Sequence, residues 1–172
     1  MKHPLENFIR DVPDFPKQGI LFKDITTLWE NPYAFKQAIE ALYDPVQDLN
    51  IDKVVGIESR GFIFGSVLAE RLSAGFVPAR KPGKLPSQTI AEHYALEYGT
   101  DSLEIHQDAI KKGEKVLIHD DLLATGGTAK AACKLIEKSG GQIIMISFFL
   151  ELTFLKGREK LANYNMNSII KY

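Results

Sequence analysis

The sequence predicts an α/β fold in which a mainly parallel, twisted sheet is flanked by helices. Two parts of the chain, residues 53–79 and residues 115–149, each show the order strand, helix, strand. That order at that spacing indicates a right-handed crossover between parallel strands. Sheets of this type bind their ligands at the carboxyl ends of the strands. We therefore expect the functional residues in the loop that follows the first strand of each crossover.

Length and composition predict a single globular domain that spans residues 1–172, with 45% hydrophobic and 25% charged residues. The net charge of −1 argues against nucleic acid or an anionic membrane as a partner. The lone Cys133 excludes an intramolecular disulfide and fits a packed core thiol. The N-terminal residues lack the apolar core of a signal peptide, and the longest apolar stretch, residues 143–150, is too short to span a bilayer. We therefore expect a cytoplasmic protein.

The N-terminal part contains a short helix, irregular chain and a longer helix. Residues 5–9 have the spacing of a short amphipathic helix, whereas two prolines and a glycine predict that residues 12–25 begin as irregular chain. The pair Asn31-Pro32 signals the start of the longer helix, because proline is favoured at the first helical position. Pro45 ends or kinks that helix.

The first crossover has a helix at residues 62–72 between strands at residues 53–57 and 76–79. After it, residues 80–101 combine prolines, a glycine and several charges, which is typical of a long mobile excursion that serves as a lid. The second crossover begins with a short buried strand at residues 116–118 and ends with a strand at residues 143–149.

The second crossover carries the densest cluster of candidate ligands. Two acids stand where its first strand would end, Asp120 and Asp121. A small-residue loop then opens a helix, and it consists of Ala124, Thr125, Gly126, Gly127 and Thr128. Such a loop leaves backbone N–H groups unpaired at the positive end of the helix, which is a ready anion site. Carboxylates would repel a phosphate, so the acids more plausibly accept hydrogen bonds from hydroxyls or face a cation. A ribose 5-phosphate fits both halves; a capped turn with solvated acids is the alternative.

A second anion site is predicted after residues 53–57, where Ser59 and Arg60 also lie between a strand and a helix. The guanidinium of Arg60 has a fork geometry that suits phosphate oxygens, although Arg60 could instead pair with Glu58 or another acid. Two such sites in one sheet could bind a monophosphate and a pyrophosphate. More positive charge follows at the start of the excursion, either for the same ligand or as a solvated basic cluster: Arg80, Lys81 and Lys84.

The run V-L-I-H-D-D-L-L-A-T-G-G-T resembles the motif with which type I phosphoribosyltransferases bind phosphoribosyl pyrophosphate (PRPP). The resemblance extends over nearly the whole chain, from P-D-F-P-K-Q-G-I to L-K-G-R-E-K-L. It implies the type I fold, with a hood and base-recognition segment at about residues 1–30 and a mobile lid at about residues 80–100. It also implies a homodimer.

Within that family, the acid pair holds the ribose 2- and 3-hydroxyls, and the loop at residues 124–128 holds the 5-phosphate. The segment with Ser59 and Arg60 resembles the pyrophosphate loop, and the three basic residues of the excursion match residues that reach pyrophosphate, some across a dimer interface. His119 departs from the apolar residue usual before the acids, and we interpret it as a strand-end residue that points away from the ligand.

The resemblance points to adenine as the acceptor. Ala124 stands where hypoxanthine-guanine enzymes carry Asp, and Thr125 stands where xanthine enzymes tend to have Asn. The segment G-I-L-F-K-D-I is similar to the adenine-recognition segment, in which the backbone around Leu21 and Lys23 reads the base. A carbonyl acceptor there would disfavour a 6-oxo group.

The side chains expected on the two ring faces of the base are Phe22 and Leu152, although composition alone would make both of them core residues. In the lid, the resemblance makes Glu97 the candidate general acid/base near adenine N7 and Tyr98 a closing residue. Arg60 would stabilise charge on the leaving pyrophosphate. Mg²⁺ is expected to be carried by PRPP, without direct protein ligands.

The expected reaction is therefore transfer of the 5-phosphoribosyl group from PRPP to adenine, giving AMP and pyrophosphate. A P-loop NTPase is disfavoured because no G-K-[S/T] follows the glycines, and a dinucleotide oxidoreductase because no G-x-G-x-x-G is present. Two alternatives stay open: an enzyme for a 6-oxopurine, and a PRPP-sensing regulator without catalysis. Regulators of that kind carry an added DNA-binding segment, for which this chain has no room.

Overall fold

The computed structural model describes residues 2–95 and 100–172. The chain divides into two compact units, Met1–Ala41 and Leu42–Tyr172. The helix α2 (Pro32–Tyr43) starts at the predicted proline and ends two residues before Pro45. In the described residues, no helix has the length and apolar character that crossing a membrane requires.

The first unit contains an antiparallel strand pair that the sequence analysis missed. Its elements before α2 are η1 (Pro4–Phe8), β1 (Arg10–Pro13), β2 (Leu21–Asp24) and α1 (Thr26–Trp29). The expected irregular chain is therefore confined to the connection between the strands, because β2 pairs with β1 in a register that sets Val12 opposite Phe22. The predicted short helix is a 3₁₀ helix, and it is capped by the side chain of His3, which accepts a hydrogen bond from the amide of Leu5.

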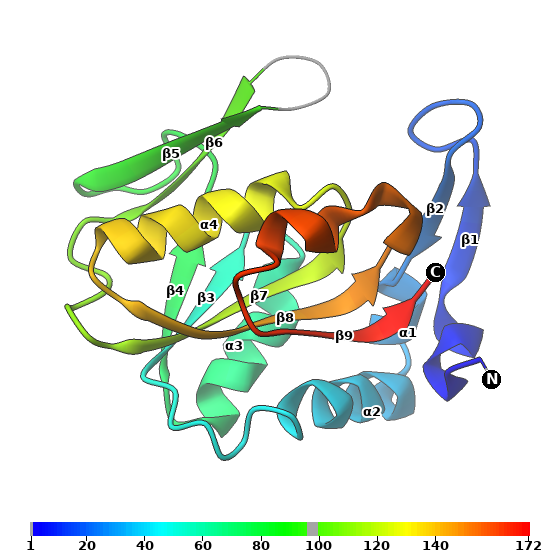
Figure 1. Cartoon of the computed structure of the whole chain (residues 1–172). Coiled ribbons are helices and arrows are strands. Elements are labelled where there is room, and N and C mark those ends of the chain that lie inside the picture. Colours follow the sequence, from blue (N-terminus) through cyan, green and yellow to red (C-terminus); the bar gives the residue numbers. More distant parts are fainter. Residues whose placement is uncertain (1, 96–99) are drawn as a thin grey trace. The chain divides into compact units, whose positions relative to one another are not determined.

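The second unit is built on a five-stranded sheet with the order β4-β3-β7-β8-β9. All of its neighbouring strands are parallel (Figure 1). The predicted α/β fold with a parallel sheet is thus confirmed. The strands are β3 (Lys53–Ile57), β4 (Gly75–Ala79), β7 (Lys115–Leu123), β8 (Gln142–Glu151) and β9 (Met166–Lys171).

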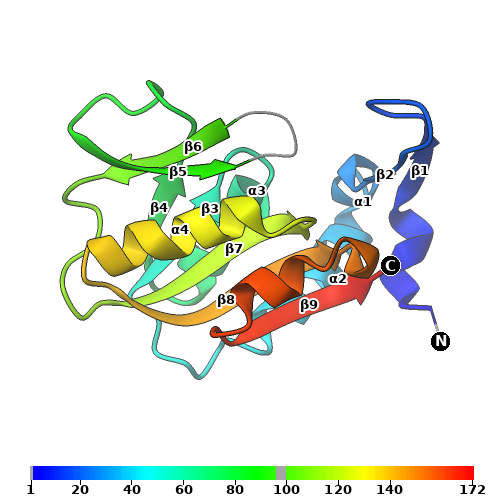
Figure 2. The ribbon, with the colours of Figure 1, turned by 45° about the horizontal axis from the view of Figure 1, so that its top comes forward.

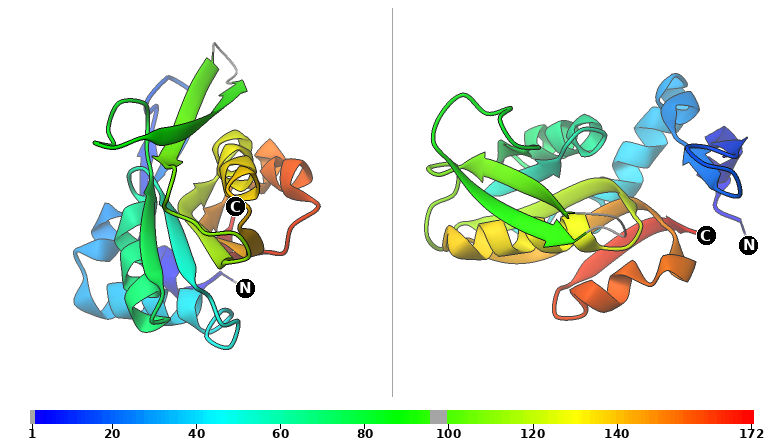
Figure 3. Two further views of the ribbon diagram at one scale, coloured as in Figure 1. Left: turned by 90° about the vertical axis from the view of Figure 1, so that its left-hand side faces the viewer. Right: turned by 90° about the horizontal axis from the view of Figure 1, so that it is seen from above.

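Helices cover both faces of this sheet. Helix α3 (Gly61–Arg71) lies on one face and α4 (Gly127–Lys138) on the other (Figure 3). Strand β7 lies in the middle of the sheet, and its residues Val116, Leu117 and Ile118 are fully buried, as expected for a strand that is covered on both sides. Two short 3₁₀ helices, η2 (Thr153–Leu155) and η3 (Gly157–Leu161), connect β8 to β9.

The predicted end of the strand before the acid pair was wrong. Strand β7 continues through Asp120 and Asp121 to Leu123, because β8 pairs with it as far as Leu123 opposite Glu151. The acids therefore belong to a paired strand. Their backbone is positioned by the sheet, which makes their placement more rigid than a loop would allow.

The expected excursion contains regular structure in its described part. Strands β5 (Thr89–Ala95) and β6 (Thr100–His106) form an antiparallel pair that lies over α4 (Figure 2). Glu92 of β5 accepts hydrogen bonds from the ammonium groups of Lys134 and Lys138 on α4. These ion pairs anchor the β5–β6 pair to α4.

Candidate functional site

The loops that follow β3 and β7 meet at the carboxyl ends of these two neighbouring strands. A pocket of about 440 Å³ opens between the loops. The first loop contributes Ser59 and Arg60, and the second strand and loop contribute Asp120, Asp121 and Thr128. The structure thus brings together both predicted anion sites and the acid pair.

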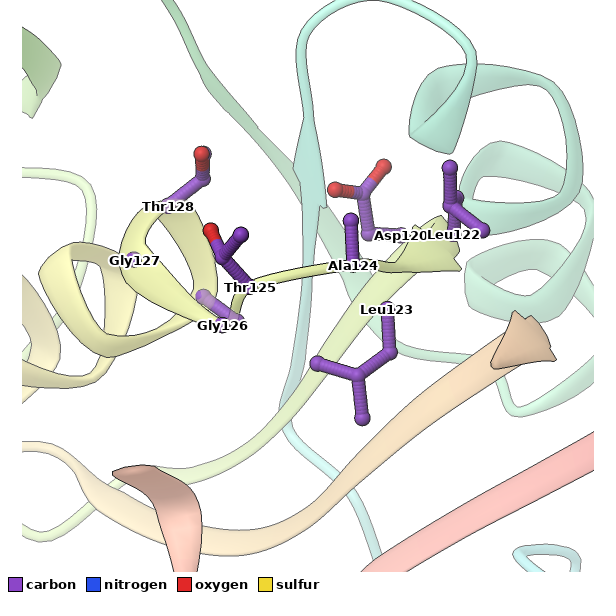
Figure 4. A pocket seen from close by; sticks show the side chains of 9 residues that line it. Asp120, Leu122, Leu123, Ala124, Thr125, Gly126, Gly127 and Thr128 are labelled. Carbon is purple, nitrogen blue, oxygen red and sulfur yellow. The ribbon is translucent and has the colours of Figure 1, made fainter. Parts of the chain in front are cut away.

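A smaller hollow of about 70 Å³ lies against the loop at residues 124–128. Figure 4 shows the side chains of Asp120, Thr125 and Thr128 on the same side of this loop, whereas Leu123 points to the other side. Among the described residues, the N-caps of α4 and α3, Gly126 and Arg60, make no side-chain capping hydrogen bond. The first amides of α4 are therefore available to an anion, whereas the amides of Phe62 and Ile63 in α3 already donate to the carbonyl oxygens of Ser59 and Arg60.

Two glycines shape this smaller hollow. Gly126 has φ of +76°, a left-handed conformation that favours glycine. A Cβ on Gly126 would lie 2.5 Å from the carbonyl oxygen of Gly157, and a Cβ on Gly157 would lie 2.2 Å from that of Ala124. The segment after β8 thus supports the loop at residues 124–128 by direct backbone contact.

The close approach of α3 to β7 depends on another glycine. A Cβ on Gly61 would lie 2.9 Å from the carbonyl oxygen of His119 and 3.0 Å from Oδ1 of Asp120. The imidazole of His119 is fully buried and packs edge-on against Phe64 of α3, with ring centroids 6.1 Å apart. Burial lowers the pKa of His119 to about 3, so this side chain is a neutral part of the core.

Arg60 pairs with the second acid of β7. Its Nε lies 2.7 Å from Oδ2 of Asp121, and only 7% of the Asp121 side chain is exposed. Glu58, the alternative partner that the sequence offers to Arg60, forms ion pairs with Arg80 and Lys84. The predicted ribose-binding and pyrophosphate-binding residues are therefore in direct contact.

Burial raises the pKa of both carboxyl groups in the acid pair. For Asp120 the negative charge of Asp121 adds to the effect and raises the pKa well above its usual range. For Asp121 the charge of Arg60 opposes burial without cancelling it. Ionisation of both groups is therefore unfavourable at this site. A ligand with hydroxyl groups or a cation would compensate the two negative charges.

Glu58 is a site residue that the sequence analysis missed. Its carboxylate accepts a hydrogen bond from the amide of Lys81 at 2.8 Å, and it lies 3.3 Å from Nε of Arg80 and 3.4 Å from Nζ of Lys84. Burial alone would raise the pKa of Glu58, but the Lys81 amide and the two cations outweigh it and lower the pKa. Of the three predicted basic residues, Lys81 lines the pocket. The other two, Arg80 and Lys84, form ion pairs with Glu58.

The residues predicted to bind the base lie in both units. Leu21, Phe22 and Lys23 belong to β2. The ring of Phe22 packs edge-on against Phe15, with centroids 5.2 Å apart, and Nζ of Lys23 lies 2.6 Å from a carboxylate oxygen of Asp11. Leu152 follows β8 and is half-buried. Glu97 and Tyr98 lie outside the described residues.

The sheet order, the loops that follow the neighbouring strands β3 and β7, and the acid pair near the end of β7 define a phosphoribosyltransferase class of fold and site. Residues 24–167 match the family model described as a phosphoribosyl transferase domain. Adenine phosphoribosyltransferase of Christiangramia forsetii is 60% identical over 168 residues, which cover 98% of each chain. That of Thermotoga maritima is 53% identical over 171 residues, or 99% of each chain.

Solved structures agree with the sequence relatives. The crystal structure of adenine phosphoribosyltransferase from Rhodothermus marinus has a TM-score of 0.93 and 55% identity, covering 98% of this chain and 96% of that one. The enzyme from Saccharomyces cerevisiae, complexed with an imino-altritol bisphosphate and adenine, has a TM-score of 0.91 and 43% identity, covering 96% of both chains. The chain belongs to the adenine phosphoribosyltransferase family and is an enzyme of the glycosyltransferase type.

Proposed function

We propose that this enzyme transfers the 5-phosphoribosyl group from PRPP to adenine, giving AMP and pyrophosphate in purine salvage. The observation that carries the proposal is the pocket at which Arg60 contacts Asp121, together with the smaller hollow against residues 124–128, which shares Asp120 and Thr128 with that pocket. PRPP has a monophosphate at one end and a pyrophosphate at the other, with hydroxyls between them. The pocket offers a complementary group for each.

In this proposal the acid pair binds the ribose hydroxyls and the loop at residues 124–128 binds the 5-phosphate. The raised pKa values of Asp120 and Asp121 support that role, because hydroxyl donors relieve the repulsion between buried carboxylates. The uncapped start of α4 supports the second role, since its amides and the hydroxyls of Thr125 and Thr128 supply donors on one side of the loop (Figure 4).

The pyrophosphate is proposed to bind on the opposite loop, at Ser59 and Arg60, with Lys81 at the edge of the pocket. Arg80 and Lys84 add positive charge from their positions around Glu58. The pocket also fits Mg²⁺ carried by PRPP, because the oxygens of Asp120 and Asp121 can accept hydrogen bonds from the water molecules around the ion. When bound, Mg²⁺ neutralises charge on the pyrophosphate.

Adenine is proposed to be recognised by the backbone around Leu21 and Lys23, with Phe22 and Leu152 against its ring. Two relatives support adenine as the base: the S. cerevisiae structure contains adenine, and a structure from Giardia lamblia, at 38% identity, contains 9-deazaadenine. Ala124 supports the same choice, because it offers no carboxylate to the base.

The proposed chemistry exchanges one bond at ribose C1. The bond between C1 and the pyrophosphate oxygen breaks, and its electron pair leaves with pyrophosphate. The lone pair of adenine N9 forms the new bond to C1, and the proton on N7 passes to Glu97. Arg60 stabilises the charge of the leaving group. Tyr98 is proposed to close the lid, which protects the reactive ribose from water.

We also propose that the enzyme acts as a homodimer in the cytoplasm. The first part rests on the family resemblance of the basic residues after β4, some of which reach a partner's pyrophosphate site in that family. The second part rests on the single, buried Cys133, which suits a reducing compartment. Analytical ultracentrifugation at enzyme concentrations used for assays tests the dimer.

The function is tested by a spectrophotometric assay in which adenine, hypoxanthine and guanine are each offered with PRPP and Mg²⁺. We expect turnover with adenine and a much lower rate with the 6-oxopurines. Turnover of hypoxanthine without adenine would contradict the assignment of the base. Tight PRPP binding without turnover of any base would contradict the assignment as an enzyme.

A further inference from the structure

Lys81 connects the pyrophosphate side of the pocket to the β5–β6 pair. Its backbone amide donates to Glu58, and the residue lines the pocket together with Ser59 and Arg60. The ammonium group, however, is directed to two residues of the antiparallel pair. It donates to the hydroxyl of Tyr94 at 2.7 Å and forms an ion pair with Asp101.

Tyr94 and Asp101 form one small network around that ammonium. They are cross-strand partners in the register of β5 and β6, and the Tyr94 hydroxyl donates to the Asp101 carboxylate at 3.2 Å. The ammonium also lies 5.3 Å from the centre of the Tyr94 ring, within reach of a cation–π interaction. The other carboxylate oxygen of Asp101 accepts from the amide of Ser102 at 2.8 Å, which fixes the orientation of the acid.

We propose that Asp101, assisted by Tyr94, is a built-in competitor of pyrophosphate for the ammonium of Lys81. This inference rests on the proposed function, in which the pocket beside Arg60 holds pyrophosphate. Asp101 neutralises Lys81 while the pocket is empty. An entering pyrophosphate must draw the ammonium away from that carboxylate or share it.

Electrostatics distinguishes two roles of Asp101: competing with pyrophosphate for Lys81, or only orienting Lys81 toward pyrophosphate. If Asp101 only oriented Lys81 for the ligand, the ammonium would gain a second anion without losing the first. The carboxylate of Asp101 and the pyrophosphate would then be like charges on one small cation, and like charges at that separation repel each other. The net effect of the acid is therefore to weaken pyrophosphate binding. For the enzyme, this weakening favours release of the product after the transfer.

The same contact links pocket occupancy to the β5–β6 pair. Strand β5 is anchored on α4 by Glu92, which lies two residues before Tyr94 in the sequence. The network of Lys81, Tyr94 and Asp101 is a second attachment, and it joins this pair to the segment that follows β4. When pyrophosphate takes the ammonium, the second attachment loosens and the first remains.

The test measures binding of pyrophosphate, in the presence of Mg²⁺, to the full-length protein by isothermal titration calorimetry. We expect Asp101→Asn to lower the Kd of pyrophosphate by roughly threefold to fivefold, the range of a partly exposed ion pair. The asparagine keeps an oxygen for the amide of Ser102. We expect Tyr94→Phe to lower the Kd by a smaller factor, since it removes the hydroxyl and keeps the ring. The product-inhibition constant for pyrophosphate should change in parallel with the Kd.

A double-mutant cycle with Lys81→Met shows whether Asp101 acts through the lysine. In the Lys81→Met background, Asp101→Asn should give less than half of its effect on the logarithm of Kd. The matched control is Asp108→Asn, which removes the same charge from an exposed position. Its Kd should stay at the wild-type value, and thermal unfolding of every variant confirms that it is folded.

Four results would overturn the inference. Three concern the acid: an unchanged or raised Kd in Asp101→Asn, the same gain in the Lys81→Met background, or the same gain in Asp108→Asn. The fourth is a Lys81→Met variant that binds pyrophosphate with the Kd of the wild type, and if the wild type converts adenine this result leaves the proposed function intact. Absence of turnover with any base would instead reject the proposed function.

Discussion

Arg60 and Asp121 form an ion pair with a distance of 2.7 Å between Nε and Oδ2, although they lie far apart in the sequence. The pair joins the loop after β3 to the last part of β7. Because Asp121 is almost fully buried, the pair holds the loop after β3 and the end of β7 in one arrangement before any ligand enters. Preorganisation of this kind lowers the reorganisation that a charged ligand requires on binding.

Replacement of Arg60 is expected to affect catalysis more than substrate binding. Arg60→Lys keeps a positive charge but loses the fork that can contact Asp121 and a phosphate oxygen together. We expect kcat to fall by about 10²–10³, as for loss of one donor to a developing anion. Steady-state kinetics with PRPP varied at saturating adenine measures kcat and the KM for PRPP. A change confined to the KM for PRPP would show that Arg60 contributes only to binding.

Asp120→Asn is expected to stabilise the ligand-free protein and to reduce its activity. Since burial and Asp121 raise the pKa of Asp120, the folded state holds this proton more tightly than the unfolded state. Stability from this group is thus present below the unfolded pKa of about 3.9 and is lost as pH rises through the folded pKa.

Asparagine cannot ionise, so the variant does not lose this stability as the pH rises. It keeps the side-chain oxygen that accepts a hydrogen bond from the amide of Asp121. Thermal unfolding without ligands should therefore show a higher Tm for Asp120→Asn at pH 8 and a smaller difference at pH 4. A variant that is less stable than wild type at pH 8 would contradict the raised pKa. In the same variant we expect a higher KM for PRPP.

Glu58→Gln is expected to raise the KM for PRPP severalfold with a small effect on kcat. The reason is that Arg80 and Lys84 lose the ion pairs that position them beside the pocket. Here the folded pKa is lowered, so the stabilisation is present above the unfolded pKa of about 4.3 and is lost as pH falls through the folded value. Glu159→Gln, at an exposed position, is the control. Equal KM values in the two variants would rule out this role for Glu58.

Gly126→Ala is expected to destabilise the loop at residues 124–128 by more than backbone strain alone. An alanine at φ of +76° costs about 1–2 kcal/mol, and its Cβ also collides with the carbonyl of Gly157. Gly113→Ala is a matched control, since Gly113 has φ of +86° with open space around its Cβ position. The difference in free energy of unfolding between the variants measures the collision. Equal losses would show that the Gly157 contact relaxes freely.

Glu97→Gln tests the proposed proton acceptor. We expect kcat to fall by about 10²–10⁴, the usual contribution of general acid–base catalysis, while the Kd of PRPP stays unchanged. Equilibrium binding and single-turnover measurements separate the two quantities. Full activity of Glu97→Gln would remove Glu97 from the proposed mechanism.

Local patterns were sufficient to determine the main features of the fold. Apolar runs followed by glycine-containing loops predicted the parallel crossovers, and the strand Lys53–Ile57 has the predicted bounds. The composition of the loop at residues 124–128 also predicted an anion site, because small residues and a helix start create unpaired amides wherever they occur together. These properties depend on neighbours in the sequence.

The tertiary structure decided the partners and the true ends of elements. Strand β7 extends through the acids because β8 supplies hydrogen bonds there, and the residues after β4 lead into a strand pair because β6 and α4 cover β5. The pairing of Arg60 with Asp121, and of Arg80 and Lys84 with Glu58, depends on distances between segments far apart in the sequence. The sequence identifies the acidic residues that a fold has to compensate. Only the tertiary structure determines which cation lies close enough to form the ion pair.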